Sequence, residues 1–141
     1  MIWTRRENNK NSLSSFQNHD YFLSRPAAWD EAASENMCEV YGGYLVEIND
    51  QDEWKFVVNL LNNNSVSHWT VIGASDMETE GAWTFVHSGL LATYLNWAPG
   101  QPQNYAHKDC LYISYTDPSH RQMHDGTCQQ DSVQRYVCEI E

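Results

Sequence analysis

The sequence lacks any long uninterrupted apolar segment. Its longest apolar stretch, residues 54–61, is broken by Lys55 and Asn59, whereas a transmembrane helix needs about 18 to 20 apolar residues. Arg5 and Arg6 are not followed by the apolar run that a signal peptide requires. We therefore expect no insertion into a membrane.

Basic residues are scarce. Eight Lys and Arg stand against 19 Asp and Glu, which gives a formal net charge of −11. An acidic surface repels the phosphate backbone of nucleic acids, so nucleic acid is not an expected partner. Cations, neutral ligands and other proteins remain as ligand classes.

Familiar catalytic motifs are absent as well. The sequence contains no Gly-x-Ser-x-Gly, no His-Glu-x-x-His and no phosphate-binding loop. Three histidines could serve as general acids or bases: His107, His120 and His124. Because no further residues complete a catalytic set around them, we do not expect an enzyme.

Four cysteines are present, and no two of them form a Cys-x-x-Cys pair. An even number without such pairs favours structural disulfides in a secreted, extracellular protein. In that case Met1 follows the removal of a signal peptide. The count alone leaves three pairings open.

A zinc site is the alternative interpretation of the cysteines. Two histidines and two cysteines could supply the four ligands, three of them at a spacing of four residues: Cys110, His120, His124 and Cys128. Pro118 and Gly126 interrupt the helix that would present this face, so disulfides are favoured.

The composition, with 41% hydrophobic and 13% aromatic residues, is typical of a globular domain. Residues 1–18 are polar and predict an N-terminal arm, with one strand near Trp3 or Phe16. Residues 19–141 predict one folded domain. The order of elements within it, helices first and short strands later, indicates the α+β class.

Two helices are expected. Ser24 and Pro26 predict the start of the first, over about residues 26–41, and a glycine pair at 42–43 predicts its end. A strand at 44–48 follows one at 21–23. Asn49 predicts the cap of the second helix, whose apolar stripe repeats at helical spacing: Trp54, Val57, Val58 and Leu61. The stretch 76–109 is long and rich in loops, which favours a functional role.

Seven segments, in this order, resemble the C-type lectin-like domain over about residues 20–141. They are residues 29–38, 43–48, 71–74, 80–85, 96–102, 109–110 and 128–139. The resemblance implies the C-type lectin-like fold, with two helices, two small antiparallel sheets and a long loop region. It also implies two disulfides, Cys38–Cys138 and Cys110–Cys128, worth roughly 4.7 and 3 kcal/mol in the chain-entropy model.

Family lectins hold calcium in the long loop and let two sugar hydroxyls complete its coordination. Gln101-Pro102-Gln103 resembles the Gln-Pro-Asp motif of galactose-type lectins, and Pro102 is expected to follow a cis bond. Lys108 stands where the family has glutamate, and His124-Asp125 where it has Asn-Asp. One carboxylate and one ammonium thus replace three carboxylates, so the primary calcium site is predicted to be degenerate.

Sugar binding is therefore expected to depend on amides, charged groups and one aromatic ring. The predicted carbohydrate-binding residues are Gln101, Gln103, Asn104, Tyr105, Lys108, His124 and Asp125. We expect Lys108 to neutralise Asp125 and to donate a hydrogen bond to the sugar. Burial is the favoured interpretation of Trp83 and Trp97.

An auxiliary calcium site is expected nearby, at positions that match a second cation site of the family. Its predicted ligands are Asp76, Glu80, Asn104 and Asp109, all oxygen donors, which suits a hard cation. The alternative is a set of solvated loop acids.

The sequence thus predicts an extracellular carbohydrate-binding module that recognises glycans or glycoproteins, with galactose- or N-acetylgalactosamine-type sugars favoured. The chain could also assemble as a homo-oligomer. The alternative function is protein binding without sugar.

Overall fold

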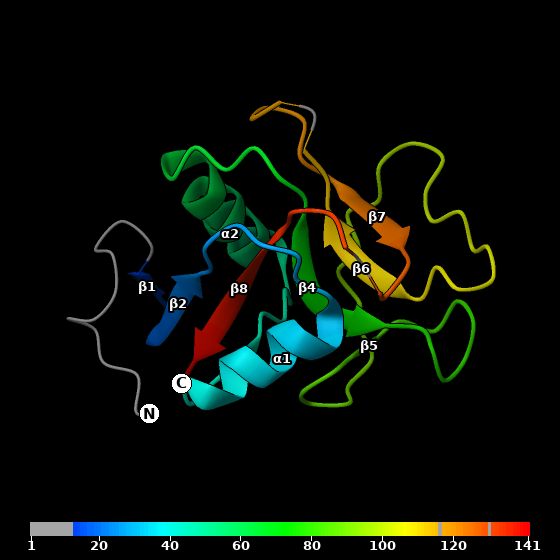
Figure 1. Ribbon diagram of the computed structural model, residues 1–141, viewed down its shortest axis with the longest axis horizontal. Helices are drawn as coiled ribbons and strands as arrows, with labels where there is room; N and C mark the ends of the chain where they lie inside the picture. Colours follow the sequence, from blue (N-terminus) through cyan, green and yellow to red (C-terminus); the bar gives the residue numbers. More distant parts are fainter. Residues whose placement is uncertain (1–12, 116, 130) are drawn as a thin grey trace.

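The computed structural model describes residues 13–115, 117–129 and 131–141, arranged as two helices and eight short strands (Figure 1). Trp3, one of the two positions expected to carry an early strand, lies outside these residues. The other expectation is confirmed, because β1 spans Leu13–Phe16 and forms a hairpin with β2, His19–Leu23. Part of the predicted arm is thus an edge strand, and the domain boundary at residue 19 stays a prediction.

Helix α1 spans Glu31–Val40 and begins later than the sequence indicated. Its N-cap is Asp30, whose carboxylate accepts a hydrogen bond from the Ala33 N–H at 2.8 Å. The predicted start at Pro26 is wrong because the next residue, Ala27, exchanges two backbone hydrogen bonds with Gln134 and is held extended.

The end of α1 is as expected. The N–H of Gly43 donates to the Cys38 carbonyl at 2.8 Å, and Gly42 has a φ of 86°. Gly43 cannot be replaced without a shift, since a Cβ atom there would lie 2.3 Å from the carbonyl oxygen of Glu139. The strand that follows, β3, covers only Tyr44–Leu45.

Helix α2 spans Gln51–Asn63 and is capped by Asp50, one residue after the predicted Asn49. The Asp50 side chain accepts from the Glu53 N–H at 2.8 Å, and the Glu53 carboxylate accepts in turn from the Asn49 N–H at 2.9 Å. The predicted apolar stripe is confirmed at Trp54, Val57 and Leu61, with Leu60 also buried and Val58 half-buried.

The strands form two antiparallel groups, as expected, and one parallel pair joins them. The first group contains β1, β2, β3 and β8 (Arg135–Ile140). The second contains β4 (Thr70–Ser75), β5 (Thr84–Phe85), β6 (Cys110–Ile113) and β7 (Met123–Gly126). Strands β4 and β8 pair in parallel between the groups, so all eight belong to one connected sheet.

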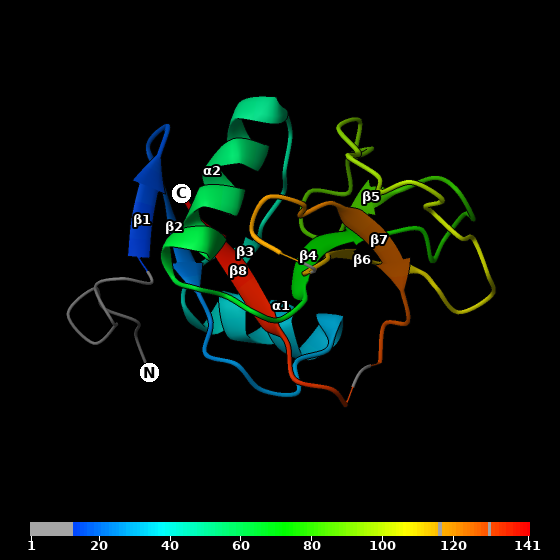
Figure 2. The same ribbon diagram turned by 90° about the horizontal axis from the view of Figure 1, so that it is seen from above.

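The two helices lie on opposite sides of β8 and β4 (Figure 2). One core cluster includes the buried face of α2 and apolar residues of the sheet, among them Val57, Leu61 and Ile72. The other includes Cys38 from α1, with Leu45 and Tyr136. The long segment between β4 and β6 contains only β5 and wraps as loops at the end of the molecule away from the helices (Figure 1).

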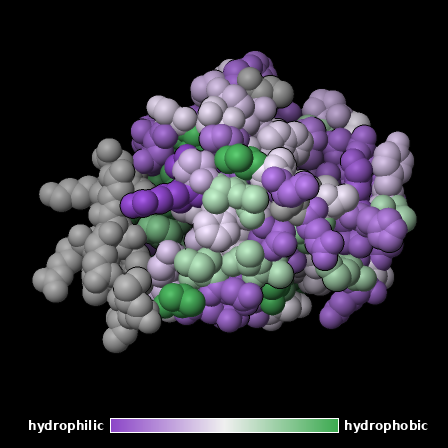
Figure 3. All heavy atoms as spheres, in the orientation of Figure 1, coloured by the Kyte–Doolittle hydropathy of each residue, from purple (hydrophilic) through white to green (hydrophobic). Residues whose placement is uncertain are grey.

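Both disulfides implied by the resemblance are present. Cys38–Cys138 joins α1 to β8, and Cys110–Cys128 joins β6 to the segment after β7. In the described part of the chain no helix is long and apolar enough to span a bilayer. Hydrophilic residues predominate on the long-loop side of the face shown in Figure 3.

Candidate functional site

The buried carboxylate of Asp125 anchors the long loop. Asp125 lies in β7 with only 4% of its surface exposed. Its two oxygens accept the backbone N–H groups of Gln103 at 3.0 Å and Asn104 at 2.8 Å. Further back, the Ala98 N–H donates to the Met123 carbonyl at 3.0 Å. Strand β7 therefore holds the long loop at two places. Both carboxylate oxygens of Asp125 are occupied by hydrogen bonds from the loop backbone.

Three of the predicted sugar-binding residues meet above this anchor. The Lys108 ammonium donates to Gln103 Oε1 at 2.5 Å and lies 5.6 Å from the ring centroid of Tyr105. The Lys108 N–H also donates to the Tyr105 carbonyl at 3.1 Å. Tyr105 is 62% exposed, so its ring is available to a ligand.

The described residues show no ion pair between Lys108 and Asp125, and the expected neutralisation of Asp125 by Lys108 stays a prediction. Among the described residues the lysine ammonium donates to the Gln103 amide, and Asp125 is satisfied by the loop backbone. The physical reason is the burial of Asp125, since backbone N–H groups of its own neighbourhood reach the carboxylate without the entropy cost of ordering a long side chain.

His124 stands beside Asp125 in β7 and packs edge-on against Trp69, with ring centroids 4.8 Å apart and planes at 74°. Burial lowers the pKa of His124, although the neighbouring Asp125 acts in the opposite direction. The imidazole is therefore neutral at pH 7 and offers one donor and one acceptor nitrogen.

Gln101 is the least exposed of the predicted amides. The Gln101–Pro102 bond is cis, which confirms that expectation. The Gln101 Oε1 atom is buried and has no hydrogen-bond partner in the part of the chain that the structure describes. The structure therefore brings Gln103, Tyr105 and Lys108 into contact, and it does not bring Gln101 into that group.

Three carboxylates of the predicted calcium set come together at the base of the long loop. Oxygen atoms of Asp76, Glu80 and Asp109 lie within 4.8 Å of one another. Asp76 is 1% exposed; its Oδ2 accepts from the Gly81 N–H at 2.9 Å, and its Oδ1 is buried without a partner among the described residues. An orphaned buried carboxylate oxygen beside two further carboxylates suits a hard cation.

The electrostatics of this cluster agree with that interpretation. Burial, together with the neighbouring Glu80, raises the pKa of Asp76. Burial, together with Asp76, raises the pKa of Asp109. Mutual repulsion of this kind is relieved when a divalent cation binds. The fourth predicted ligand, Asn104, contributes its N–H to Asp125, and its role at the cation stays a prediction.

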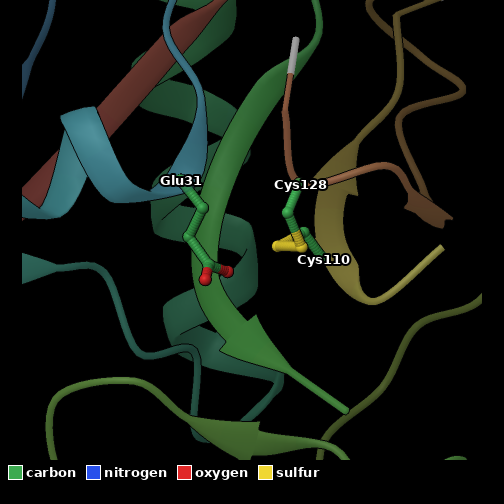
Figure 4. A group of neighbouring side chains, drawn as sticks. All are labelled: Glu31, Cys110 and Cys128. Atoms are coloured by element: carbon green, nitrogen blue, oxygen red, sulfur yellow. A yellow bond between two sulfur atoms is a disulfide. The ribbon is translucent and has the colours of Figure 1, made fainter. Parts of the chain in front are cut away.

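A second group, Glu31, Cys110 and Cys128, also brings potential metal ligands together (Figure 4). The two sulfur atoms form a disulfide and so offer no thiolate, which rules out the zinc site considered from the sequence. Glu31 Oε2 is buried without a partner in the described residues, and burial raises the pKa of this carboxyl to about 8. Glu31 is therefore a largely buried carboxyl beside a disulfide, and its protonated form is favoured.

The burial expected of Trp83 and Trp97 is confirmed in full for Trp83 and in part for Trp97. Trp83 is buried and Trp97 is half-buried against the core, and the two rings meet edge-on at 5.4 Å. Trp69 instead is 38% exposed and lines a groove of about 470 Å³ with Lys108 and Val133. No local sequence pattern indicates this groove, because Trp69 and Val133 are brought together only by the fold.

The family model described as Lectin C-type domain matches residues 25–140. A perlucin-like protein of Mytilus galloprovincialis is 32% identical over 128 residues, covering 87% of this chain and 77% of that protein. Asialoglycoprotein receptor 2 of Homo sapiens is 33% identical over 126 residues, covering 84% of this chain and 36% of the receptor. This chain thus corresponds to about a third of the receptor's length.

Solved structures show the same fold. The carbohydrate-recognition domain of the mouse scavenger receptor C-type lectin matches with a TM-score of 0.75 and 26% identity, over 92% of this chain and 94% of that one. Human lithostathine matches with a TM-score of 0.80 and 20% identity, over 97% of this chain and 93% of that one.

Proposed function

The chain belongs to the C-type lectin domain family, and from that premise we propose that it is an extracellular carbohydrate-binding module. In this proposal the long loop binds the sugar through side chains, without a calcium ion at the primary position. The single observation that supports it is the contact of Lys108 with Gln103, an ammonium and an amide at two positions that the resemblance assigns to the primary ion site.

The loop is suited to sugar hydroxyls because it is anchored and rich in polar groups. Asp125 holds the backbone of Gln103 and Asn104, which lowers the entropy lost when a ligand binds. Lys108 offers donors, neutral His124 offers a donor and an acceptor, and the exposed ring of Tyr105 offers an apolar face for a pyranose.

Galactose- or N-acetylgalactosamine-type sugars are the proposed ligands. The support is the Gln101-Pro102 pair, which resembles the galactose-type motif, together with the similarity to a receptor named for asialoglycoproteins. Glycans or glycoproteins are accordingly the proposed partners. Two disulfides support a proposed secreted location, and a homo-oligomer is proposed as the assembled form.

Calcium is proposed as a structural cation at Asp76, Glu80 and Asp109, with Asn104 as a fourth ligand. The orphaned Asp76 Oδ1 and the carboxylate spacing support it. A cation there would tie the end of β4 to the start of β6 and so stiffen the base of the long loop. No catalytic role is proposed for the chain, since the family consists of binding domains.

Protein binding without sugar is the second candidate. The observation that favours it is that Lys108 and Gln103 satisfy each other's hydrogen bonds, which leaves fewer free groups for a sugar. An exposed Tyr105 would serve equally well in a protein interface.

A glycan array, probed with and without a calcium chelator, separates the two candidates. Binding of galactose-terminated glycans that survives chelator is the expected result. Binding that is lost with chelator would overturn the ion-independent site, because the loop would then need an ion at the primary position or at the Asp76 cluster. Silence on every glycan would favour the protein-binding function and overturn the carbohydrate proposal.

A further inference from the structure

A groove extends from the long-loop site across the outer face of the sheet. It has a volume of about 470 Å³, and its lining includes Trp69, Lys108, Tyr112, Asp125, Gly126 and Val133. Its size lies in the range of about 300 to 1,000 Å³ typical of small-ligand pockets. Lys108 and Asp125 belong both to this groove and to the candidate sugar site, so the two are continuous.

The groove has an aromatic wall whose position is fixed. Trp69 is held by edge contacts to His124 at 4.8 Å and to Tyr112 at 6.5 Å between ring centroids. Tyr112 is itself buried and donates from its hydroxyl to the Thr127 carbonyl at 2.5 Å. An indole that is ordered before a ligand arrives loses little entropy on binding.

Gly126 allows the Tyr112 ring to pack closely against β7. A Cβ atom at this position would lie 2.9 Å from that ring, closer than packed atoms allow. The groove is also lined by Val133, an aliphatic side chain that is 52% exposed.

We propose that this groove is a second sugar subsite, which holds the residue linked to the sugar bound at the long loop. The inference rests on the proposed carbohydrate function. Trp69 would contact the apolar face of the second pyranose, and Val133 would bound it from the other side.

The chemistry of the lining favours a sugar over a purely apolar ligand. The indole of Trp69, 38% exposed, carries an N–H donor on the edge of an apolar ring system. Lys108 adds a cationic donor at the junction of the two subsites. A pyranose matches this combination because it carries an apolar C–H face and polar edges.

The test compares a monosaccharide and a disaccharide on the whole chain. Binding of methyl β-galactoside and methyl β-lactoside is measured by calorimetry on the wild type and on Trp69→Ala, Trp69→Phe and Leu90→Ala. The lactoside should bind more tightly to the wild type. Trp69→Ala should weaken lactoside binding about fivefold more than it weakens galactoside binding, and Trp69→Phe should retain part of the gain.

Leu90→Ala is the matched control, since Leu90 is an exposed apolar side chain, 67% exposed, outside the groove. It should change neither affinity. Equal affinity of the wild type for the two glycosides would overturn the subsite, as would an equal loss of both in Trp69→Ala. Binding of neither glycoside to the wild type would instead overturn the proposed function and the subsite with it.

Discussion

The Lys108 ammonium donates a hydrogen bond of 2.5 Å to Oε1 of Gln103 within the long loop. In the proposed function this side-chain cation replaces a bound calcium ion. Because a lysine is not removed by a chelator, the two arrangements respond differently to the same experiments.

The first prediction concerns this lysine. Lys108→Ala should weaken sugar binding about tenfold, because a hydrogen bond to a charged donor contributes about 1.5 to 3 kcal/mol. Added calcium should not restore it. Lys55→Ala, which removes an exposed lysine on α2, is the control for charge and should bind like the wild type. Calorimetry with methyl β-galactoside gives the affinities; an unchanged affinity in Lys108→Ala would contradict the role given to the ammonium.

The second prediction concerns the acidic cluster. Asp76→Asn should lower calcium affinity at least about tenfold, because it removes one of three carboxylate ligands of a hard cation. Without calcium the same variant should be at least as stable as the wild type, since a repelling charge is gone. Glu78→Gln, an exposed acid of the same loop, is the control. Calcium titration followed by calorimetry and thermal unfolding checks both; equal affinity in Asp76→Asn and Glu78→Gln would exclude the site.

The third prediction concerns Glu31. Burial raises the pKa of this carboxyl from 4.5 to about 8, so the folded protein holds a proton there that the unfolded chain releases. The free energy of unfolding should therefore fall as the pH rises from about 4.5 to about 8, by an amount on the order of a few kcal/mol. Glu31→Gln should reduce this fall and raise the stability at pH 8.

Denaturant unfolding at several pH values measures the effect of Glu31→Gln. Glu39→Gln, an exposed glutamate of the same helix, serves as the matched control and should follow the wild type. A parallel pH dependence in Glu31→Gln and the wild type would mean that the Glu31 carboxyl is ionised in the folded state.

The fourth prediction concerns the link between the first hairpin and the last strand. His19 Nδ1 lies 2.5 Å from Glu139 Oε2, and this hydrogen bond raises the pKa of His19. The histidinium therefore contributes stability that is complete below about pH 6.5 and is lost as the pH rises through the folded pKa. Burial raises the pKa of Glu139 as well. Ionisation of Glu139 as the pH rises therefore also lowers the free energy of unfolding.

His19→Gln should accordingly be less stable than the wild type by about 1 to 3 kcal/mol at pH 6. The difference should disappear at alkaline pH, where the His19 imidazole is neutral, like the glutamine amide that replaces it. His120→Gln alters an exposed pair with Asp117 and should cost less stability than His19→Gln. Denaturant unfolding at pH 6 and at alkaline pH distinguishes the two, and a pH-independent cost of His19→Gln would contradict the ionic contribution.

Local sequence patterns predicted a helix or strand well where short-range spacing determines it. The apolar spacing of Trp54, Val57 and Leu61 gave α2, because a helix places residues at these intervals on one face. The same logic failed at Pro26, which is a good helix start by itself. The neighbouring Ala27 pairs with Gln134, and no local pattern contains that partner.

The candidate site divides in the same way. The resemblance indicated which residues the long loop brings toward a ligand, and the structure joins Gln103, Tyr105 and Lys108. It did not indicate that Asp125 would hold the loop backbone and leave Lys108 to an amide. The choice of a hydrogen-bond partner depends on distances of a few tenths of an ångström, which residue types do not encode.

The sequence by itself determined the α+β order of elements, the acidic surface and the supply of oxygen ligands at residues 76, 80 and 109. These properties depend on composition and on short-range spacing. Only the tertiary structure decided that the Asp76 oxygen is left buried without a partner, and that Trp69 and Val133 face one groove. Both depend on strand pairing between distant segments, which places side chains together for reasons that lie outside their own neighbourhood in the chain.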